Sequence, residues 1–199
     1  MTIAYPRERV EDVLLDAPLP PSVRIFPTRH RFTPKGVGPS DSRFAGRADP
    51  YSVLYAAPDF ATAFVEVVIR DRFAKRVGDR SVHLAELRNL SFTVIRSGSA
   101  VLRWLDLRDD GCLRLGAPTD AVRARHNAAG RALARSIHAR HPDIDGILFP
   151  GRLTGFNVYA VFDRALGRVE ADTAAPLATH PDLPDALRRY DIWIDHPKT

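Results

Sequence analysis

Hydrophobic and polar positions along the chain predict short strands interleaved with two main helices. Residues 22–26 alternate, with Val23 and Ile25 on one face and Arg24 on the other, as in a half-buried strand. Short apolar runs predict further strands at 52–57, 82–87, 92–95, 144–149 and 157–162. The stretch 100–107 fits either a strand or a helix. This mixture of local hairpins with a few helices favours an α+β fold.

The first main helix is expected to begin near Phe60, where Asp59 can cap its N-terminus, and to end between 71 and 74. Its apolar residues recur at the spacing of one buried stripe: Phe60, Phe64, Val67 and Val68. The second main helix is predicted from Pro118 to about Arg140. Its apolar face comprises Val122, Ala129, Leu133 and Ile137.

The remaining segments suggest a three-part organisation. Residues 1–21 are interpreted as an N-terminal leader, with a short helix seeded by Val10, Val13 and Leu14 and ended by the prolines that follow. Residues 22–166 form the predicted domain, which includes a long loop at 27–50. Residues 167–199 are interpreted as an extension packed on that domain, with a short helix at 183–190.

Composition narrows the class of protein. The chain has 199 residues, of which 45% are apolar and 27% charged, as in a soluble globular domain. Its single cysteine, Cys112, excludes an internal disulfide and a multi-cysteine metal cage. No apolar run could span a bilayer, and the N-terminus lacks the layout of a signal peptide, so we expect a cytoplasmic protein.

The net charge of +5 comes almost entirely from arginine, since lysine occurs only at Lys35, Lys75 and Lys198. A planar guanidinium binds phosphate or carboxylate through two parallel hydrogen bonds, which an ammonium group cannot do. The arginine content therefore indicates either an anionic ligand or acidic partner, or only the codon bias of a GC-rich genome.

Four residues between 24 and 66 are the main candidates for chemistry: Arg24, Arg43, Tyr55 and Glu66. Glu66 lies on a largely apolar helix, where a carboxylate needs a donor or destabilises the fold. The alternatives are ordinary. Glu66 could form an i,i+4 pair with Arg70, Arg24 could be a strand-surface residue, and Tyr55 could serve packing alone.

Other motifs are weaker candidates. The Gly-Val-Gly of 36–38 lacks the context of a dinucleotide fingerprint and is interpreted as a turn. His138 and His141 have helical i,i+3 spacing without a third ligand, so no metal site is expected. Cys112 is expected to be inert. The arginine-rich helix at 123–140 could follow nucleic-acid phosphates but is better explained as a solvated surface.

The ordered set of motifs resembles the RES-domain family, the toxins of bacterial RES–Xre toxin–antitoxin systems. The resemblance is carried by Arg24, Ser-Arg-Phe at 42–44, Val-Leu-Tyr-Ala-Ala at 53–57 and Ala-Phe-Val-Glu-Val at 63–67. Asp-Gly-Ile at 145–147 and Val-Phe-Asp-Arg-Ala at 161–165 resemble the closing strands of the family. The likeness covers about residues 22–166.

One position departs from the family pattern. Where the family has a serine after its Asp-Gly-Ile strand, this chain has Gly151. Thr154 or Ser40 could supply a substitute hydroxyl.

The resemblance implies a fold similar to the ADP-ribosyltransferases, with mixed and antiparallel sheets and flanking helices. It also implies cleavage of NAD+, which would be a substrate and not a tightly bound cofactor. Arg24 and Arg43 would clamp the pyrophosphate, Tyr55 would stack on the nicotinamide or its ribose, and Glu66 would stabilise the oxocarbenium ion. Glu66, Tyr55 and Arg43 would form the catalytic set.

The implied partner is an Xre-like, DUF2384-type antitoxin, with a protein as one possible acceptor of ADP-ribose besides water or phosphate. Nucleic acid would be contacted only through the antitoxin. The alternative hypothesis is a catalytically impaired RES homologue that binds an antitoxin or nucleic acid.

Overall fold

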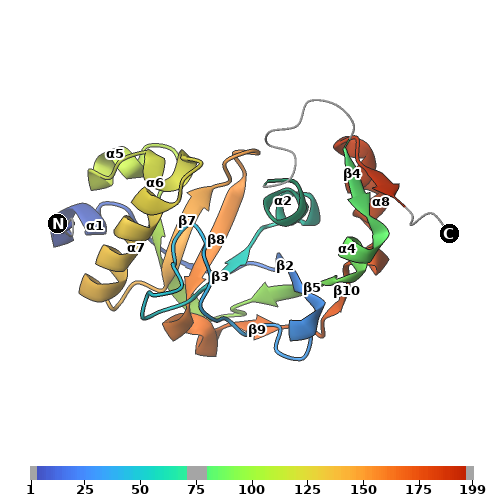
Figure 1. The fold of residues 1–199 in the computed structure, drawn as a ribbon. Coiled ribbons are helices and arrows are strands. Elements are labelled where there is room, and N and C mark those ends of the chain that lie inside the picture. The colour runs from blue at the N-terminus through green and yellow to red at the C-terminus, as the bar shows by residue number, and fades with distance from the viewer. Residues whose placement is uncertain (1–3, 71–79, 196–199) are drawn as a thin grey trace.

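The computed structural model describes residues 4–70 and 80–195, which form two sheets with helices on their outer sides (Figure 1). The larger sheet has five strands in the order β1-β6-β7-β8-β3, and its neighbours are antiparallel except for the parallel pair β6 and β7. Its strands are β1 (Leu14–Pro18), β6 (Val101–Asp106), β7 (Gly146–Pro150), β8 (Asn157–Phe162) and β3 (Val53–Ala56). The predicted α+β class is confirmed.

The second sheet lies against the first. Its order is β10-β5-β2, and β9 also pairs with β5. These strands are β2 (Ser22–Pro27), β5 (Leu90–Arg96), β9 (Glu170–Ala171) and β10 (Ala175–Pro176). An antiparallel bridge joins the two sheets, because the backbone amides of Val23 and Ala57 each donate to the other's carbonyl at 2.7 and 2.9 Å. A small parallel pair, β4 (Ser81–His83) and β11 (Trp193–Asp195), lies beyond the second sheet (Figure 1).

The N-terminal segment differs from its predicted helix. Helix α1 (Arg7–Glu11) contains Val10, which is fully buried, but the chain then turns and Leu14 begins β1. Leu14 pairs with Leu105, so residues 14–18 form an edge strand of the large sheet. The apolar residues that suggested one helix are shared between a helix and a strand, which both pack on the same core.

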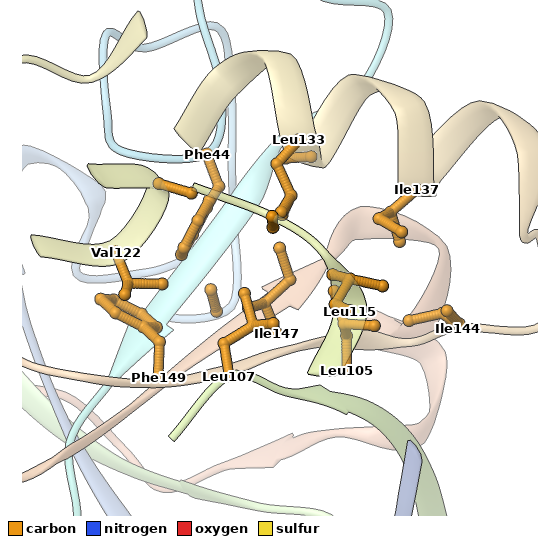
Figure 2. Close-up of a cluster of buried hydrophobic side chains, with 14 of the residues drawn as sticks. Phe44, Leu105, Leu107, Leu115, Val122, Leu133, Ile137, Ile144, Ile147 and Phe149 are labelled. Atoms are coloured by element: carbon orange, nitrogen blue, oxygen red, sulfur yellow. The ribbon is translucent and has the colours of Figure 1, made fainter. Parts of the chain in front are cut away.

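Three apolar clusters hold the layers together. The helices α5 (Gly111–Leu115), α6 (Asp120–Arg123) and α7 (Ala128–Arg140) cover the outer face of the large sheet. Figure 2 shows this cluster, in which Phe44 from the long loop meets Phe149 from β7; their rings are edge to face, with centroids 4.9 Å apart. A second cluster lies between the two sheets around Trp104, and a third lies between β2, α2 and the C-terminal segment.

The predicted helix at 118–140 is in fact two helices, α6 and α7, interrupted at 124–127. Its apolar residues are buried or partly buried as expected, including Val122, Leu133 and Ile137. The interruption leaves the carbonyl of Ala124 outside the helical hydrogen bonding, and the guanidinium of Arg43 donates to it at 2.9 Å. A tertiary contact thus stabilises the break, and the periodicity of the sequence gives no sign of it.

The helix that carries Glu66 begins as predicted, because the side chain of Asp59 accepts from the amide of Thr62 at 2.8 Å. It is α-helical over α2 (Phe60–Phe64) and then widens into a π-helical turn, η2 (Val65–Ile69). The wider turn rotates later residues away from the α-helical stripe. Val67 was expected to be buried with Phe64 and Val68, but 44% of it is exposed. The predicted end at 71–74 lies outside the described residues.

One further strand prediction is wrong in its length, and one ambiguous stretch is now assigned. The run at 82–87 forms only the short strand β4, and α4 (Leu84–Arg88) follows directly. The ambiguous stretch at 100–107 is the strand β6. The predicted strands at 92–95, 144–149 and 157–162 correspond to β5, β7 and β8, and the predicted C-terminal helix corresponds to α8 (Leu183–Arg189).

The C-terminal segment packs against the helix that carries Glu66. In this segment, η4 (Leu177–Thr179) contacts β5 and α4, and α8 contacts α2. The ring of His180 stacks on Phe60 at 3.8 Å and meets Phe92 edge-on at 4.4 Å. The extension therefore supports one side of the candidate site.

Candidate functional site

The side chain of Arg24 extends from β2 to the part of the long loop at 36–40. Its side chain donates to the carbonyl of Gly36 at 2.9 Å, and its Nε has no hydrogen-bond partner although it is buried. Burial lowers the pKa of Arg24 to about 10, which leaves the guanidinium protonated at neutral pH. The contact also assigns a role to the Gly-Val-Gly turn of 36–38, which packs beside the arginine.

Arg43 lies in the long loop and is only 6% exposed. One guanidinium nitrogen donates to Ala124, while the other, Nη1, is buried without a hydrogen-bond partner. Burial and the nearby positive charge of Arg70 lower the pKa of Arg43. Neither Arg24 nor Arg43 forms an ion pair with a carboxylate in the described part of the chain. Buried guanidinium groups without a carboxylate partner are well suited to an anionic ligand.

Tyr55 fixes the loop that carries Arg43. Its hydroxyl donates to the Oγ of Ser42 at 3.0 Å and accepts from the backbone amide of Phe44 at 2.9 Å. These bonds bracket Arg43 on both sides, and burial raises the pKa of the phenol. The ring packs edge-on against Phe149, with centroids 6.5 Å apart. Tyr55 therefore has a structural role, and its hydrogen bonds to the loop go beyond the packing role that the sequence analysis considered.

Glu66 lies on the π-helical turn, and its two carboxylate oxygens have different surroundings: one is paired with Arg70 and the other is buried. Its Oε2 accepts from Arg70 at 3.0 Å, which is the i,i+4 pair considered above. Its Oε1 is buried and has no hydrogen-bond partner. The Glu66 side chain is only 12% exposed. A π-helical turn is an uncommon feature that occurs often at functional sites.

All four predicted residues line one pocket of about 270 Å³. The pocket contains Arg24 from β2, Arg43 from the long loop, Tyr55 from β3 and Glu66 from η2. A second pocket of about 430 Å³ adjoins it, since the two share Arg24, Pro27, Ser40 and Val53. The structure thus brings together side chains that are far apart in the sequence, in a cavity of the size that binds small molecules.

The two candidate hydroxyls occupy different places. Ser40 is exposed and lies where the two pockets meet. Thr154 lies beside Gly151, because a Cβ added to Gly151 would be 3.1 Å from the Oγ1 of Thr154 and 2.8 Å from the Oε1 of Glu66. Thr154 therefore lies close to the Glu66 carboxylate, on the Gly151 side, whereas Ser40 shares the pocket with Glu66.

Among the pocket residues that were not predicted as part of the site, three contact or flank the predicted ones. Arg70 pairs with Glu66, Ser42 accepts from Tyr55, and Val67 contributes apolar surface. Arg70 and Ser42 were visible in the sequence, as the i,i+4 partner of Glu66 and the neighbour of Arg43. The position of Val67 could not be foreseen, because it depends on the π-helical turn.

The weaker candidates, the two histidines at the C-terminal end of α7 and Cys112, lie outside the pocket and pack within the fold. His138 stacks on Tyr51 at 4.2 Å, and within residues 4–70 and 80–195 no group of ligating side chains could hold a metal ion. Cys112 is buried, and burial raises the pKa of its thiol. No helix in the described part of the chain has the length and apolar character needed to cross a membrane.

Comparison with known proteins identifies the family of the chain. The sequence profile of the RES domain matches residues 21–186, which includes every residue of the pocket and continues past the predicted domain end at 166. The chain belongs to the RES-domain family. Arg24, Arg43, Tyr55 and Glu66, which carried the resemblance to the family in the sequence, are therefore the pocket residues of a RES domain.

Two proteins illustrate what this RES domain is similar to. A relative from Sinorhizobium fredii (strain NBRC 101917 / NGR234), described as "Probable toxin y4kH", is 33% identical over 114 residues, which are 57% of this chain and 89% of that relative. A chain in the crystal structure of the M. tuberculosis MbcT–MbcA toxin–antitoxin complex superposes with a TM-score of 0.62. It is 18% identical, with 92% of this chain and 96% of that chain covered. The second likeness shows a shared fold.

Proposed function

We propose that this protein is the toxin of a bacterial toxin–antitoxin system and that it cleaves the N-glycosidic bond of NAD+. The observation that carries the proposal is one pocket in which Arg43, which is buried, and Arg24, which is partly buried, lack carboxylate partners and face a tyrosine and a largely buried glutamate. Membership of the RES-domain family and similarity to a probable toxin support the same assignment.

The arginines suit the pyrophosphate of NAD+. Each makes one hydrogen bond to a backbone carbonyl, so further donors of each guanidinium remain for phosphate oxygens. Arg24 lines both adjoining pockets, which provide about 270 and 430 Å³. In this arrangement the nicotinamide half occupies the pocket of Glu66, and the pyrophosphate lies at Arg24 and Arg43.

Glu66 supplies the negative charge that the reaction needs. When the bond between the ribose carbon and the nicotinamide nitrogen breaks, its electron pair moves to the nitrogen and neutral nicotinamide leaves. The ribose becomes an oxocarbenium ion, which a nearby carboxylate stabilises. Water, phosphate or a protein side chain then adds to that carbon and loses its proton. Because nicotinamide is a cation while bound in NAD+, no general acid is required.

The partner is proposed to be an Xre-like antitoxin. The M. tuberculosis structure with the shared fold is, by its description, a toxin–antitoxin complex. An antitoxin that covers the pocket would block access of NAD+ to Arg24 and Glu66. Co-expression with the neighbouring reading frame, followed by co-purification, tests this part of the proposal independently of chemistry.

Incubation of the purified protein with NAD+ and detection of nicotinamide tests the activity. Glu66→Gln keeps the size of the side chain but removes its charge, and it should lower turnover at least a hundredfold. Glu170→Gln is a matched control at an exposed glutamate away from the pocket. No release of nicotinamide by the wild-type protein, or full activity of Glu66→Gln, would contradict the proposal.

A binding protein without catalytic activity is the second candidate, and Gly151 favours it. Because Gly151 has no side chain, the family hydroxyl at that position is missing directly beside Glu66. This candidate predicts binding of the antitoxin without release of nicotinamide. The assay with the wild-type protein separates the two functions.

A further inference from the structure

The immediate surroundings of Glu66 contain a glycine at very close range. A Cβ on Gly151 would lie 2.8 Å from the Oε1 of Glu66, a distance that real Cβ atoms do not adopt. The carboxylate oxygen therefore occupies space that any other residue at 151 would fill. Gly151 sits at the end of β7, where its amide donates to Phe156 at 2.7 Å and its carbonyl accepts from Gly155 at 2.8 Å. These bonds hold a tight turn at 151–156.

The same turn brings a hydroxyl to the carboxylate. The Oγ1 of Thr154 lies 3.1 Å from the point at which a Cβ of Gly151 would stand. The Oγ1 of Thr154 and the Oε1 of Glu66 are thus both within about 3 Å of one point. The two oxygens are therefore at most about 6 Å apart, a gap that a change of side-chain rotamer or one bridging water can close.

Both groups have unused hydrogen-bonding capacity. Thr154 accepts from the amide of Phe156 at 3.2 Å, and its hydroxyl proton makes no hydrogen bond to another described residue. The Oε1 of Glu66 has no donor, while its Oε2 is held by Arg70. A buried carboxylate oxygen without a donor destabilises the protein unless a donor approaches it. Thr154 is the hydroxyl that the fold places beside it.

We infer that Thr154 is a positioning residue for Glu66. Its hydroxyl donates to Oε1, directly or through a bridging water, and Gly151 leaves the space in which the two groups meet. Arg70 and Thr154 then hold one carboxylate oxygen each, which fixes the plane of the carboxylate against the ribose. This inference rests on the proposed function for its effect on rate, whereas the contact itself can be tested without turnover.

The first experiment compares three variants by the kinetics of nicotinamide release. Thr154→Val keeps the shape but removes the hydroxyl, and kcat should fall about ten- to a hundredfold with little change in KM, as for loss of a hydrogen bond to a charged group. Thr154→Ser keeps the hydroxyl and should retain most of the rate. Thr173→Val changes an exposed threonine elsewhere and should match the wild type. Full activity of Thr154→Val, or equal losses in Thr154→Val and Thr154→Ser, would overturn the inference.

The second experiment measures the coupling without NAD+. Free energies of unfolding are determined in urea for Thr154→Val, Glu66→Ala and the double variant. Non-additive effects show that the two side chains interact, and the Thr173→Val and Glu66→Ala pair should be additive. Additivity of the Thr154 pair would contradict the inference. Coupling in a protein that releases no nicotinamide would instead leave the inference standing and refute the proposed function.

Discussion

The hydroxyl of Tyr55 donates to Ser42 at 3.0 Å and thereby joins strand β3, at one edge of the large sheet, to the loop that carries Arg43. The same hydroxyl accepts from the amide of Phe44, so Arg43 lies between two residues that are both fixed to Tyr55. The long loop is further held by Arg131, which donates to the carbonyl of Ser42 at 2.9 Å. Tyr55 therefore determines where the arginine of the loop is placed.

Tyr55→Phe should destabilise the protein and weaken substrate binding. The variant loses both hydrogen bonds and leaves the amide of Phe44 without an acceptor, so the free energy of unfolding should fall by about 1–3 kcal/mol. The KM for NAD+ should rise because Arg43 is less well placed. Urea denaturation and kinetics of nicotinamide release measure the two effects. Tyr159→Phe is the control, because Tyr159 is buried and its hydroxyl forms no hydrogen bond to another described residue. If Tyr55→Phe changes stability and KM no more than Tyr159→Phe does, Tyr55 does not position Arg43.

Arg24→Lys should weaken NAD+ binding although it keeps the positive charge. An ammonium group lacks the planar array of donors of a guanidinium, so it cannot donate to the carbonyl of Gly36 and to a phosphate in the same fixed geometry. We expect a roughly tenfold higher KM for NAD+. Isothermal titration with ADP-ribose measures binding without catalysis. Arg140→Lys, at an exposed position of α7, should have no effect. An affinity equal to that of the wild type would show that Arg24 does not contact the ligand.

Gly130→Ala should be strongly destabilising, although alanine is the better helix former. A Cβ at 130 would lie 2.6 Å from the carbonyl oxygen of Arg43 and 2.7 Å from that of Ala121. Since both are backbone atoms, the loop or α6 must move, and we expect a loss of about 2 kcal/mol or more in urea denaturation. Gly167→Ala is the control, because no atom lies within 4 Å of its Cβ position. Equal stability of the two variants would contradict this packing argument.

Stability should decrease as the pH falls from 7.5 to 5.5. Burial lowers the pKa of His180 and of His138 below the ordinary histidine value of 6.5, so the unfolded chain binds protons more readily than the folded one. The stability that depends on the neutral rings is complete above about pH 6.5 and is lost as the pH drops through the lowered values. The unfolding free energy measured across this range should show a smaller slope in His180→Phe. A slope identical to that of the wild type would exclude His180 as a source.

Local pattern was sufficient for most strands, whereas tertiary contacts decided the departures. The strands β2, β3 and β7 are apolar runs that lie where the pattern predicts them, at 22–26, 52–57 and 144–149. The break at 124–127 could not be predicted, because the helix periodicity continues across it and the stabilising donor is Arg43, more than eighty residues away. The exposed position of Val67 likewise follows from a π-helical turn that apolar spacing does not reveal.

The membership of the site followed from the order of motifs, but its geometry did not. Arg24, Arg43, Tyr55 and Glu66 come from four different elements, and only the packed sheets place them around one pocket. The pairing of Tyr55 with Ser42, and the closeness of Gly151 to Glu66, depend on contacts between distant segments. Such contacts leave no periodic signal in a single sequence.

The bridge between Val23 and Ala57 has a consequence for length changes in the chain. It fixes the register of β2 against the end of β3, and side chains alternate between faces along a strand. Inserting or deleting one residue in β2 would therefore turn the side chain of Arg24 to the opposite face of the strand and remove its guanidinium from the pocket. One residue more or less in the exposed stretch at 31–33 would leave that register intact. Homologues of this chain should thus differ in length within the loop and keep β2 free of insertions and deletions.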